Sequence, residues 1–509
     1  MALARERASV KRPASGLASL VWRFVVIGLV LGLAADGFLP TALEPAARLL
    51  KIRRAQAGGA VVIESQPALT GQEVEVAVYG PIGAPSGRFS SKPGFFGVAG
   101  VQIPWLAEED REAEMILAAA SGARSIGLDF EWKKIQTEAG RWEWEETDEV
   151  VRLAKKYNLR VVPMLMYTPE WASSLPFAPM DYQRASPVRY SLYRDFVYQV
   201  VNRYKPYGAF TETRDGYGIT DWVIWNEPNV QPAGRDPLPM NFWYGSLEDY
   251  IQLLRAGFEG AHAADPGCNV LNGGLADVYW KPGEADLVTA VERLYDPNGD
   301  GNAGDGGRAF FDTLNLHIYP PGKNAVGQLD AHWYQDRLDA VLRIMARYGD
   351  TDKKIWITET GYGSTRRPLA MLPEGSLPLV SEADQARAVA LVYETLAAYP
   401  QVERVFWWSV RNLSANEADS NVMMEAHYGL VRANFYPKPA YYAYMRIAGG
   451  AERVYAARVN LDPSGITVVN LPPGRLQKPG QYFILAAASE DESGAVIDGA
   501  AAVGWLAVP

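Results

Sequence analysis

Two glutamates, Glu227 and Glu359, each stand where a short apolar run ends. Glu227 lies in VIWNEPNV, residues 223–230, just before a proline, and Glu359 lies in KIWITET, residues 354–360. A carboxylate at the end of a buried strand is costly unless the strand opens into a cleft where the group exchanges a proton. The two residues are therefore candidates for acid and base chemistry.

Two carboxyl groups on opposite sides of one cleft are what the hydrolysis of an acetal requires. One is protonated and helps the alkoxide to leave, whereas the other is ionised and meets the oxocarbenium ion that develops. Their surroundings must push the two pKa values apart. A salt bridge within the fold is the alternative for either glutamate taken alone.

Polar and aromatic residues occupy further strand ends of the same kind. His317 and Tyr319 are two residues apart and therefore share one face of a strand. These side chains would give a carboxylate pair hydrogen-bond partners and an aromatic wall. The full set is Asn226 before Glu227, His317 and Tyr319 within residues 313–319, and Trp407 and Trp408 within residues 404–410.

Short apolar runs alternate with longer amphipathic segments from Phe95 onward. In the longer segments apolar residues recur at three and four positions, which predicts helices with one buried face. Eight such repeats over about 350 residues predict an α/β fold, a (β/α)8 TIM barrel. The predicted strands are residues 95–98, 125–130, 160–166, 221–226, 269–274, 313–319, 354–360 and 404–410, and the predicted helices include residues 147–158, 193–204, 247–264, 334–348 and 382–399.

A doubly wound open sheet is the alternative, but no glycine-rich nucleotide-binding turn follows the first predicted strand. In a barrel, reactive groups lie at the C-terminal ends of the strands. Glu227 follows the fourth predicted strand and Glu359 lies near the end of the seventh. The barrel would therefore bring them to opposite sides of one cup.

The chain divides into four predicted parts: a basic N-terminal segment over residues 1–54, a strand-containing segment over residues 55–92, the catalytic barrel over residues 93–449 and a β-rich domain over residues 450–509. After Gly450, strand-like runs alternate with Gly, Pro and Asp turns. About 60 residues make a marginal core. We therefore expect strands within residues 58–80 to complete a small accessory domain.

The N-terminal segment contains an apolar run within residues 17–35, and Arg and Lys residues precede it. Its uncharged part, residues 24–35, has the length of a signal-peptide core rather than of a membrane span. Positive charge before the run would keep the N-terminus inside and send the rest of the chain out. We expect export to the cell surface or medium, with the segment either cleaved or kept as a membrane tether; a buried helix is the alternative.

The composition narrows the function. With 49 Lys and Arg against 59 Asp and Glu, the formal net charge is −10, which disfavours nucleic acid as a partner. The single cysteine, Cys268, excludes an intramolecular disulfide and a CxxC motif. The chain has four histidines, and we predict neither a metal site nor a cofactor.

Four motifs occur in order: WNEPN (225–229), LHIYP (316–320), WITETG (356–361) and FWWS (406–409). Together with GARSIGLDFEW (122–132) and MYTPEWAS (166–173) they resemble the retaining glycoside hydrolases of clan A, most of all family 39 and its close relatives. The resemblance covers roughly residues 95–450. It implies hydrolysis of O-glycosidic bonds in a polysaccharide or oligosaccharide by double displacement.

The resemblance also implies roles for single residues. Glu227 would be the general acid/base and Glu359 the nucleophile, with carboxyl groups about 5–5.5 Å apart. Asn226 would bind the 2-hydroxyl of the sugar at the cleaved subsite. Tyr319 would steady Glu359, and His317 would line the same pocket.

The aromatic residues would form the walls of the cleft. By the resemblance, Trp408, and with it Trp407, would stack beneath the sugar ring. Trp171 in the loop after the third strand would face the substrate or pack within its loop, and the same alternatives hold for Trp243. The neighbouring carboxylate, Glu170, is interpreted as a solvated charge.

Several activities fit this resemblance. A β-xylosidase or an endo-acting hydrolase of a surface exopolysaccharide is preferred, and a β-glucanase or β-mannanase is the alternative enzyme. A catalytically weak carbohydrate-binding surface protein is the alternative from another class. It is kept open because Gly127 stands where the second strand of the family often carries an arginine that touches the nucleophile.

Neighbours of Gly127 do not replace that arginine in an obvious way. Arg124 is three positions earlier and faces the other side of the strand. Asp129 shares the face of Gly127 and either belongs to this difference or serves the fold. In the loop 296–301, DPNGDG, acidic and amide residues alternate as at the start of an EF-hand, but Gly307 stands at the twelfth position, so a plain turn is preferred.

Overall fold

The computed structural model describes residues 50–56, 60–69, 71–81, 92–100, 108–178, 182–211, 216–230, 241–277, 286–321, 329–365, 379–413, 427–472, 476, 480–488 and 501–508. The predicted apolar run at residues 17–35 lies outside the described residues. Among the helices of the described part, none combines the length and apolar character that crossing a membrane requires.

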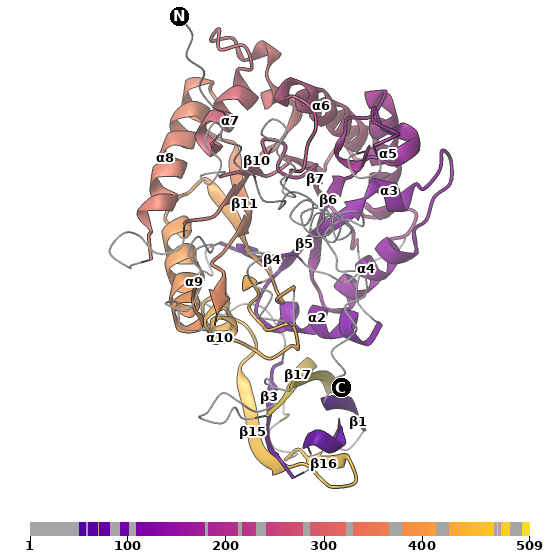
Figure 1. Ribbon diagram of the computed structural model, residues 1–509, viewed down its shortest axis with the longest axis vertical. Helices are drawn as coiled ribbons and strands as arrows, with labels where there is room; N and C mark the ends of the chain where they lie inside the picture. The colour runs from indigo at the N-terminus through magenta and orange to yellow at the C-terminus, as the bar shows by residue number, and fades with distance from the viewer. Residues whose placement is uncertain are drawn as a thin grey trace, which may run out of the picture.

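Eight parallel strands close into a barrel at the centre of the molecule (Figure 1). Neighbours follow chain order, and closure comes from the parallel pairing of β14 with β4. The predicted (β/α)8 barrel is confirmed. Its strands are β4 Phe96–Ala99, β5 Ser125–Glu131, β6 Arg160–Met166, β7 Asp221–Ile224, β8 Asn269–Asn272, β10 Thr313–Ile318, β11 Lys354–Thr360 and β14 Val402–Trp408, with the two-residue β9 Leu275–Ala276 beside β10.

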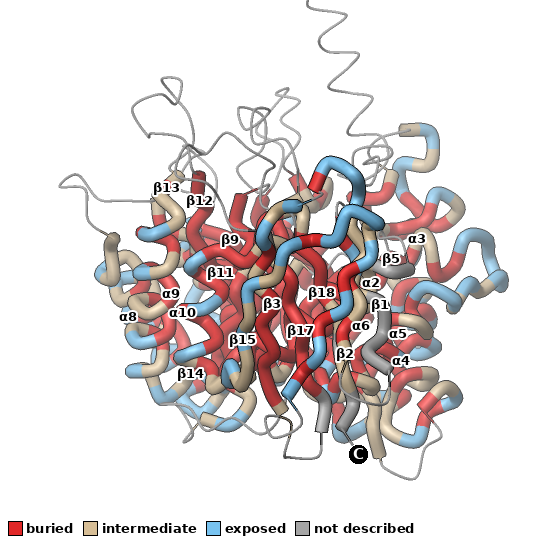
Figure 2. The backbone as a smooth tube through the Cα atoms, turned by 90° about the horizontal axis from the view of Figure 1, so that it is seen from below, coloured by how far each residue is buried: buried red, intermediate tan, exposed pale blue. Residues whose placement is uncertain are grey.

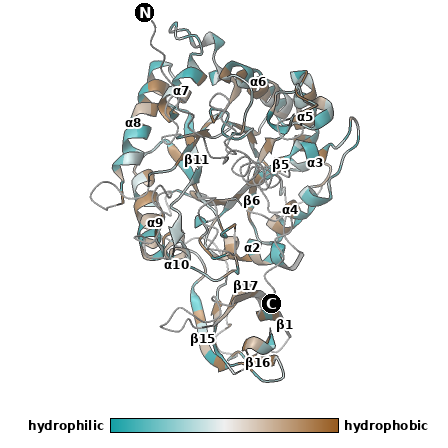
Figure 3. Ribbon diagram, in the orientation of Figure 1, coloured by the Kyte–Doolittle hydropathy of each residue, from teal (hydrophilic) through white to brown (hydrophobic). Residues whose placement is uncertain are grey.

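Helices cover the outside of the barrel. Buried residues concentrate on the strands and exposed residues on the outer helices (Figure 2), and the hydropathy colours follow the same division (Figure 3). Ser246 begins the longest of these helices, α6, with a capping box that it forms with Asp249. The helices are α2 Glu108–Ala120, α3 Trp132–Ile135, α4 Glu145–Lys156, α5 Tyr190–Tyr204, α6 Leu247–Ala264, α7 Leu287–Tyr295, α8 His332–Arg347, α9 Glu382–Ala397 and α10 Pro439–Ala448.

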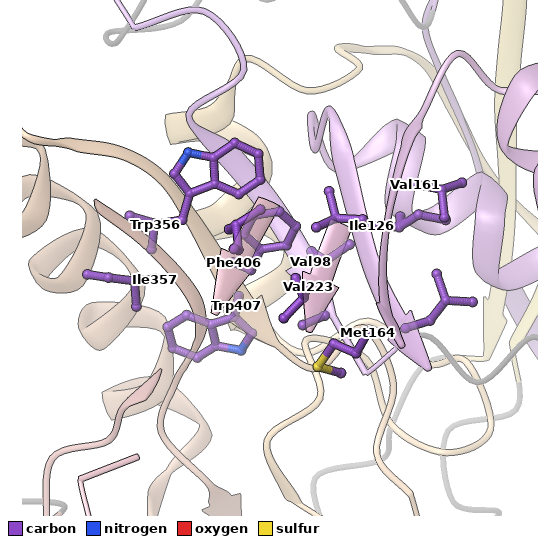
Figure 4. Close-up of a cluster of buried hydrophobic side chains, with 14 of the residues drawn as sticks. Val98, Ile126, Val161, Met164, Val223, Trp356, Ile357, Phe406 and Trp407 are labelled. Atoms are coloured by element: carbon purple, nitrogen blue, oxygen red, sulfur yellow. The ribbon is translucent and has the colours of Figure 1, made fainter. Parts of the chain in front are cut away.

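Large apolar side chains pack on both faces of the barrel strands, and Figure 4 shows part of this cluster. Phe406 takes space that Gly97 leaves free, since a Cβ on Gly97 would lie 2.5 Å from its ring. Trp356 stacks on the same phenyl ring with centroids 6.2 Å apart. A barrel filled in this way is a packed core, and it gives the strand ends a rigid base.

The accessory domain combines strands that precede the barrel in the sequence with strands that follow it. β3 pairs with β15 and β17, and β2 pairs with β16, always antiparallel. The strands expected within residues 58–80 therefore do share its sheets. Because β1 begins at Leu50, the predicted boundary at residue 54 falls inside a strand. The strands are β1 Leu50–Gln56, β2 Ala60–Ser65, β3 Glu73–Tyr79, β15 Arg453–Asn460, β16 Ile466–Asn470, β17 Gly480–Ala488 and β18 Ala501–Val508.

Candidate active site

The chain turns sharply after β7 to present Glu227. Trp225 and Glu227 have φ angles of 74° and 42°, a region that costs a non-glycine residue about 1–3 kcal/mol. Packing enforces this turn: the indole N–H of Trp225 donates to the Phe242 carbonyl at 2.8 Å, and its ring lies edge-on against Trp243. Backbone strain of this kind clusters at functional sites.

Glu227 and Glu359 meet across the cup, as the strand-end positions predicted. One carboxylate oxygen of each, together with a ring nitrogen of His317, lie within 4.8 Å of one another. Each glutamate side chain is 11% exposed, so protein encloses it while one side remains open. The separation is short compared with the roughly 6.5–9.5 Å that leaves room for a water between two carboxyl groups.

Burial raises the pKa of Glu359 to about 7. The hydroxyl of Tyr319, and His317 in its protonated form, act in the opposite direction, whereas the carboxyl group of Glu227 raises the pKa. The two carboxyl groups thus compete for one proton, and the hydrogen-bond partners of each decide where that proton lies.

A bulge between β10 and β11 brings two consecutive residues to the site. The register shifts after Leu316, so that His317 pairs with Glu359 and Thr358 is the extra residue. In a regular strand Thr358 and Glu359 would point to opposite faces. The bulge re-aims the side chains, and the Thr358 hydroxyl reaches the ring of His317 at 3.0 Å.

A chain of hydrogen bonds fixes which nitrogen of His317 carries the proton. The Thr358 hydroxyl donates to Asn315 Oδ1 at 2.7 Å, so its oxygen accepts from His317 Nε2. Burial lowers the pKa of His317, so the ring is neutral and its Nδ1 carries a lone pair. Nδ1 lies 2.8 Å from Glu227 Oε1 and accepts a hydrogen bond from the protonated carboxyl group. This arrangement favours the protonated form of Glu227.

Tyr319 acts on the other carboxyl group. Its hydroxyl donates to Glu359 Oε2 at 2.8 Å, and burial raises the pKa of Tyr319 well above its ordinary value. The hydroxyl thus remains a donor and favours the ionised form of Glu359. The two glutamates are consequently biased toward opposite protonation states.

In the variant Tyr319→Phe, we expect the pKa of Glu359 to rise, because a hydrogen bond to its ionised form is lost. If the ionised form is the reactive one, activity disappears as the pH falls through that pKa. The acidic limb of kcat/KM against pH should therefore move upward by about one to two units. Tyr348→Phe removes a hydroxyl that binds Glu292 and Asp296 instead, so it is the control. An acidic limb that stays in place would contradict the assigned role.

Gly274 makes room for the imidazole of His317. A Cβ on Gly274 would lie 2.0 Å from His317 Nε2, which no real contact allows. Any larger residue must therefore push the ring away from Thr358 and Glu227.

The variant Gly274→Ala should lower kcat by about 10²-fold, because misplacing a catalytic group by about 1 Å has this effect. Overpacking should also lower the free energy of unfolding by about 1–3 kcal/mol. Gly267→Ala is the matched control, since the nearest atom to its Cβ lies 3.6 Å away. Steady-state kinetics and thermal unfolding measure both effects, and an unchanged kcat would show that the position of His317 is unimportant.

Of the two predicted aromatic residues on β14, Trp408 alone borders the site. It is partly exposed and lies beside Tyr428, with ring centroids 5.7 Å apart, and Tyr428 in turn contacts Tyr319. The prediction that Trp407 joins the stacking wall is wrong. Trp407 is fully buried within the cluster of Figure 4, and its indole N–H donates to the Tyr428 carbonyl, because successive strand residues point to opposite faces.

Asn226 carries a buried acceptor without a partner among the described residues. Its side chain is 6% exposed, and its Oδ1 accepts no hydrogen bond from any described residue. Buried acceptors almost always have a donor, so a free acceptor next to Glu227 points to a bound group as its partner.

The aromatic residues predicted in the loops around the site mainly pack against other parts of the protein. The indole N–H of Trp171 donates to the Gln136 carbonyl at 3.0 Å, which favours the loop-packing alternative. Trp243 is fully buried behind Trp225 and cannot form a wall of the cleft. Glu170 is exposed, in agreement with a solvated charge.

The strands pack closely where the arginine is missing. A Cβ on Gly127 would lie 3.3 Å from the Cβ of Ala99 on the next strand, so a side chain there would need a small shift of its neighbour. Glu359 has the hydroxyl of Tyr319 as its donor instead. This observation weakens the case for a barrel that only binds carbohydrate.

Two other groups have the chemistry of metal ligands. In the loop 296–301, the carboxylate of Asp296 accepts the N–H groups of Gly301 and Asp300, as in an Asp/Gly turn. Glu227, His317 and Glu359 together would suit a divalent cation. A cation bound there would have to displace the hydrogen bond between His317 and Glu227.

Sequence reasoning missed four residues that support the site: Asn315, Thr358, Gly274 and Tyr428. Asn315 shares a strand face with His317, which is a signal available from spacing alone. Thr358 could not be found in this way, since its orientation depends on the bulge. Gly274 lies in the NGG sequence after β8, and the glycine pair was the only sign of close packing.

Comparison with known families gives one match. Residues 293–433 fit the model of a family described as glycosyl hydrolase catalytic core. This stretch includes β10, β11 and β14, and with them His317, Tyr319, Glu359 and Trp408. No match was found among curated proteins.

Solved structures with the same fold include glycoside hydrolases. A family 39 glycoside hydrolase from the gut symbiont Bacteroides cellulosilyticus is 15% identical, with a TM-score of 0.50 over 87% of this chain and 90% of that chain. A monomeric β-xylosidase from Caulobacter crescentus is 16% identical, with a TM-score of 0.47 over 80% and 75%. The GH39 enzyme from Xanthomonas axonopodis pv. citri is 17% identical, with a TM-score of 0.46 over 90% and 79%.

Proposed function

We propose that this chain, a glycoside hydrolase whose residues 293–433 match a glycosyl hydrolase catalytic core on a closed (β/α)8 barrel, is a retaining β-glycosidase. The observation that carries the proposal is the short distance between the carboxylates of Glu227 and Glu359, whose oxygens lie within 4.8 Å of each other. A gap of this size favours direct attack by one carboxylate over attack by an intervening water.

In the first step, ionised Glu359 attacks the anomeric carbon while Glu227 gives its proton to the leaving glycosidic oxygen. The bond from that carbon to the leaving oxygen breaks as the bond to Glu359 forms, which yields a glycosyl-enzyme ester and an alcohol. The hydrogen bonds described above prepare each group for its role: His317 accepts from protonated Glu227, and Tyr319 donates to ionised Glu359.

In the second step, Glu227 is ionised and removes a proton from a water that attacks the same carbon. The ester bond to Glu359 breaks, and the sugar leaves with its original anomeric configuration. Glu227 regains its proton, so the enzyme returns to its starting state. No cofactor enters either step.

For the substrate, we propose a β-linked polysaccharide or oligosaccharide. The family 39 resemblance supports a β-xylosidase-like activity or endo-acting hydrolysis of an exopolysaccharide, and Trp408 offers one aromatic face for a sugar ring. We also propose export, with residues 17–35 as either a cleaved signal or a tether, on the basis of the apolar run and the positive charges before it.

Proton NMR during hydrolysis of an aryl β-glycoside tests the mechanism. The first sugar released should be the β-anomer, with the α-anomer appearing later through mutarotation. Release of the α-anomer first would establish inversion and overturn the proposal. Polysaccharides of known linkage then separate endo from exo action, since release of terminal sugars alone would reject the endo-acting version.

A further inference from the structure

A third carboxylate lies on the inner face of the barrel. Gly127 and Asp129 point to the same side of β5, and the close approach of Gly127 to Ala99 shows that this side faces the barrel interior. Ala99 on β4 pairs in turn with Trp408 on β14. Around the rim, Trp408 therefore stands between Glu359 on β11 and Asp129 on β5. A sugar ring on Trp408 would have a carboxylate on either side.

Asp129 is available to a ligand. Its side chain is partly exposed, and it makes no hydrogen bond or ion pair with another described residue. Lys133 and Lys134, on the following helix α3, act on Asp129 without pairing with it, since they lie 3.3 and 3.1 Å from the carboxylate of Glu131. A largely enclosed carboxylate without a hydrogen-bond or ion-pair partner destabilises the folded state. A purely structural role would give no reason to keep it there.

The charges of the cleft are unbalanced. Burial raises the pKa of Asp129 to about 7, and Asp129 in turn raises the pKa of Glu359. His317 is buried and its pKa is lowered, so it adds no positive charge at neutral pH. At Gly127, where the family often has an arginine, this chain has no side chain to supply a positive charge. Three carboxyl groups thus face a common space, and Lys133 and Lys134, the cations that lower the pKa of Asp129, are already paired with Glu131.

We propose that Asp129 binds a protonated amino group on a sugar ring in the cleft, so that the preferred substrates are β-glycosides of free amino sugars. This proposal rests on the proposed function and names its substrate class. An ammonium group satisfies the lone pairs of Asp129 and also balances the excess negative charge. A neutral hydroxyl group satisfies the lone pairs alone.

Matched aryl β-glycosides test this selectivity. We compare a 4-nitrophenyl glycoside of glucosamine, with its amine free, against the corresponding glucoside. The wild-type enzyme should favour the amine, and Asp129→Asn should lower the ratio of the two kcat/KM values by at least about tenfold, mainly through KM. Glu170→Gln, which neutralises an exposed carboxylate on the same rim, should leave the ratio unchanged.

Two kinetic outcomes would overturn the proposal: a wild-type preference for the neutral glycoside, or an unchanged ratio in Asp129→Asn. An unchanged ratio that results from an equal loss on both substrates would indicate a hydroxyl contact. A binding measurement keeps the test independent of turnover. Calorimetry at fixed salt should show that chitosan oligosaccharides bind the Glu359→Gln variant at least about tenfold more tightly than the double variant with Asp129→Asn. Tight binding without any hydrolysis by the wild-type enzyme would reject the proposed function and leave this inference standing; equal binding would reject the inference.

Discussion

Replacing Glu359 with glutamine is expected to lower kcat by about 10⁴-fold or more, because a residue that forms the covalent intermediate has no substitute in the site. Glutamine keeps the shape of the side chain, and its amide oxygen still accepts from the Tyr319 hydroxyl. Substrate binding should therefore persist while turnover is lost. Steady-state kinetics on an aryl glycoside and calorimetry with an oligosaccharide measure the two properties separately.

The control for this variant is Glu403→Gln. Glu403 is an exposed carboxylate at the opposite end of β14, where it accepts from the Trp356 indole at 2.7 Å. Its replacement should leave kcat within a factor of two or three of the wild-type value, as expected of surface changes. A Glu359→Gln enzyme with comparable activity would show that the nucleophile lies elsewhere and would remove the basis of the mechanism.

Replacing Glu227 with alanine is expected to have an effect that depends on the leaving group. A sugar alcohol leaves only after protonation, so kcat on a disaccharide should fall by about 10²–10⁴-fold. A dinitrophenolate leaves without help, so the first step should be nearly unaffected with a dinitrophenyl glycoside. The second step still lacks its base, and the glycosyl-enzyme should accumulate and give a burst of dinitrophenolate.

Added azide provides the decisive observation for Glu227→Ala. Azide needs no general base, so it should accelerate turnover and yield a glycosyl azide with the β configuration. The same variant without a burst, or with an α-glycosyl azide as its product, would contradict the assignment of Glu227. The Glu359→Gln variant cannot form the intermediate and should give no burst, which distinguishes the two carboxylates in one experiment.

Much of the fold was predictable because the strands carry a strong local signal. All eight barrel strands appear where apolar runs were identified, and β6 and β11 have the predicted bounds. The meeting of Glu227 and Glu359 follows from the barrel itself, since parallel strands place their C-terminal ends on one rim. For the same reason His317 and Tyr319, two residues apart on β10, both reach the carboxylates.

The remainder depended on geometry that a sequence does not display. Trp407 and Trp408 are identical in chemistry, and only the pleat of β14 decides which one is buried. The role of Thr358 arises from a register shift between β10 and β11. The alternation of apolar and polar residues in the sequence does not predict such a shift. For Trp243 the sequence left a place in the cleft wall and packing within the loop equally open, and its contact with Trp225 decides for packing.

The pairing of β3 with β15 and β17 has a consequence for how the molecule is made. The ribosome synthesises β3 before the barrel, whereas β15 and β17, the sheet partners of β3, are synthesised after the barrel. The edges of β3 therefore remain unpaired during nearly the entire synthesis. Such long-range pairing forms late and slowly. An unpaired strand edge is able to pair with strands of other chains, which leads to aggregation. Truncated variants that keep the barrel but lack the strands before or after it would leave these strand edges unpaired. We expect such variants to self-associate rather than to lose the structure of the active site.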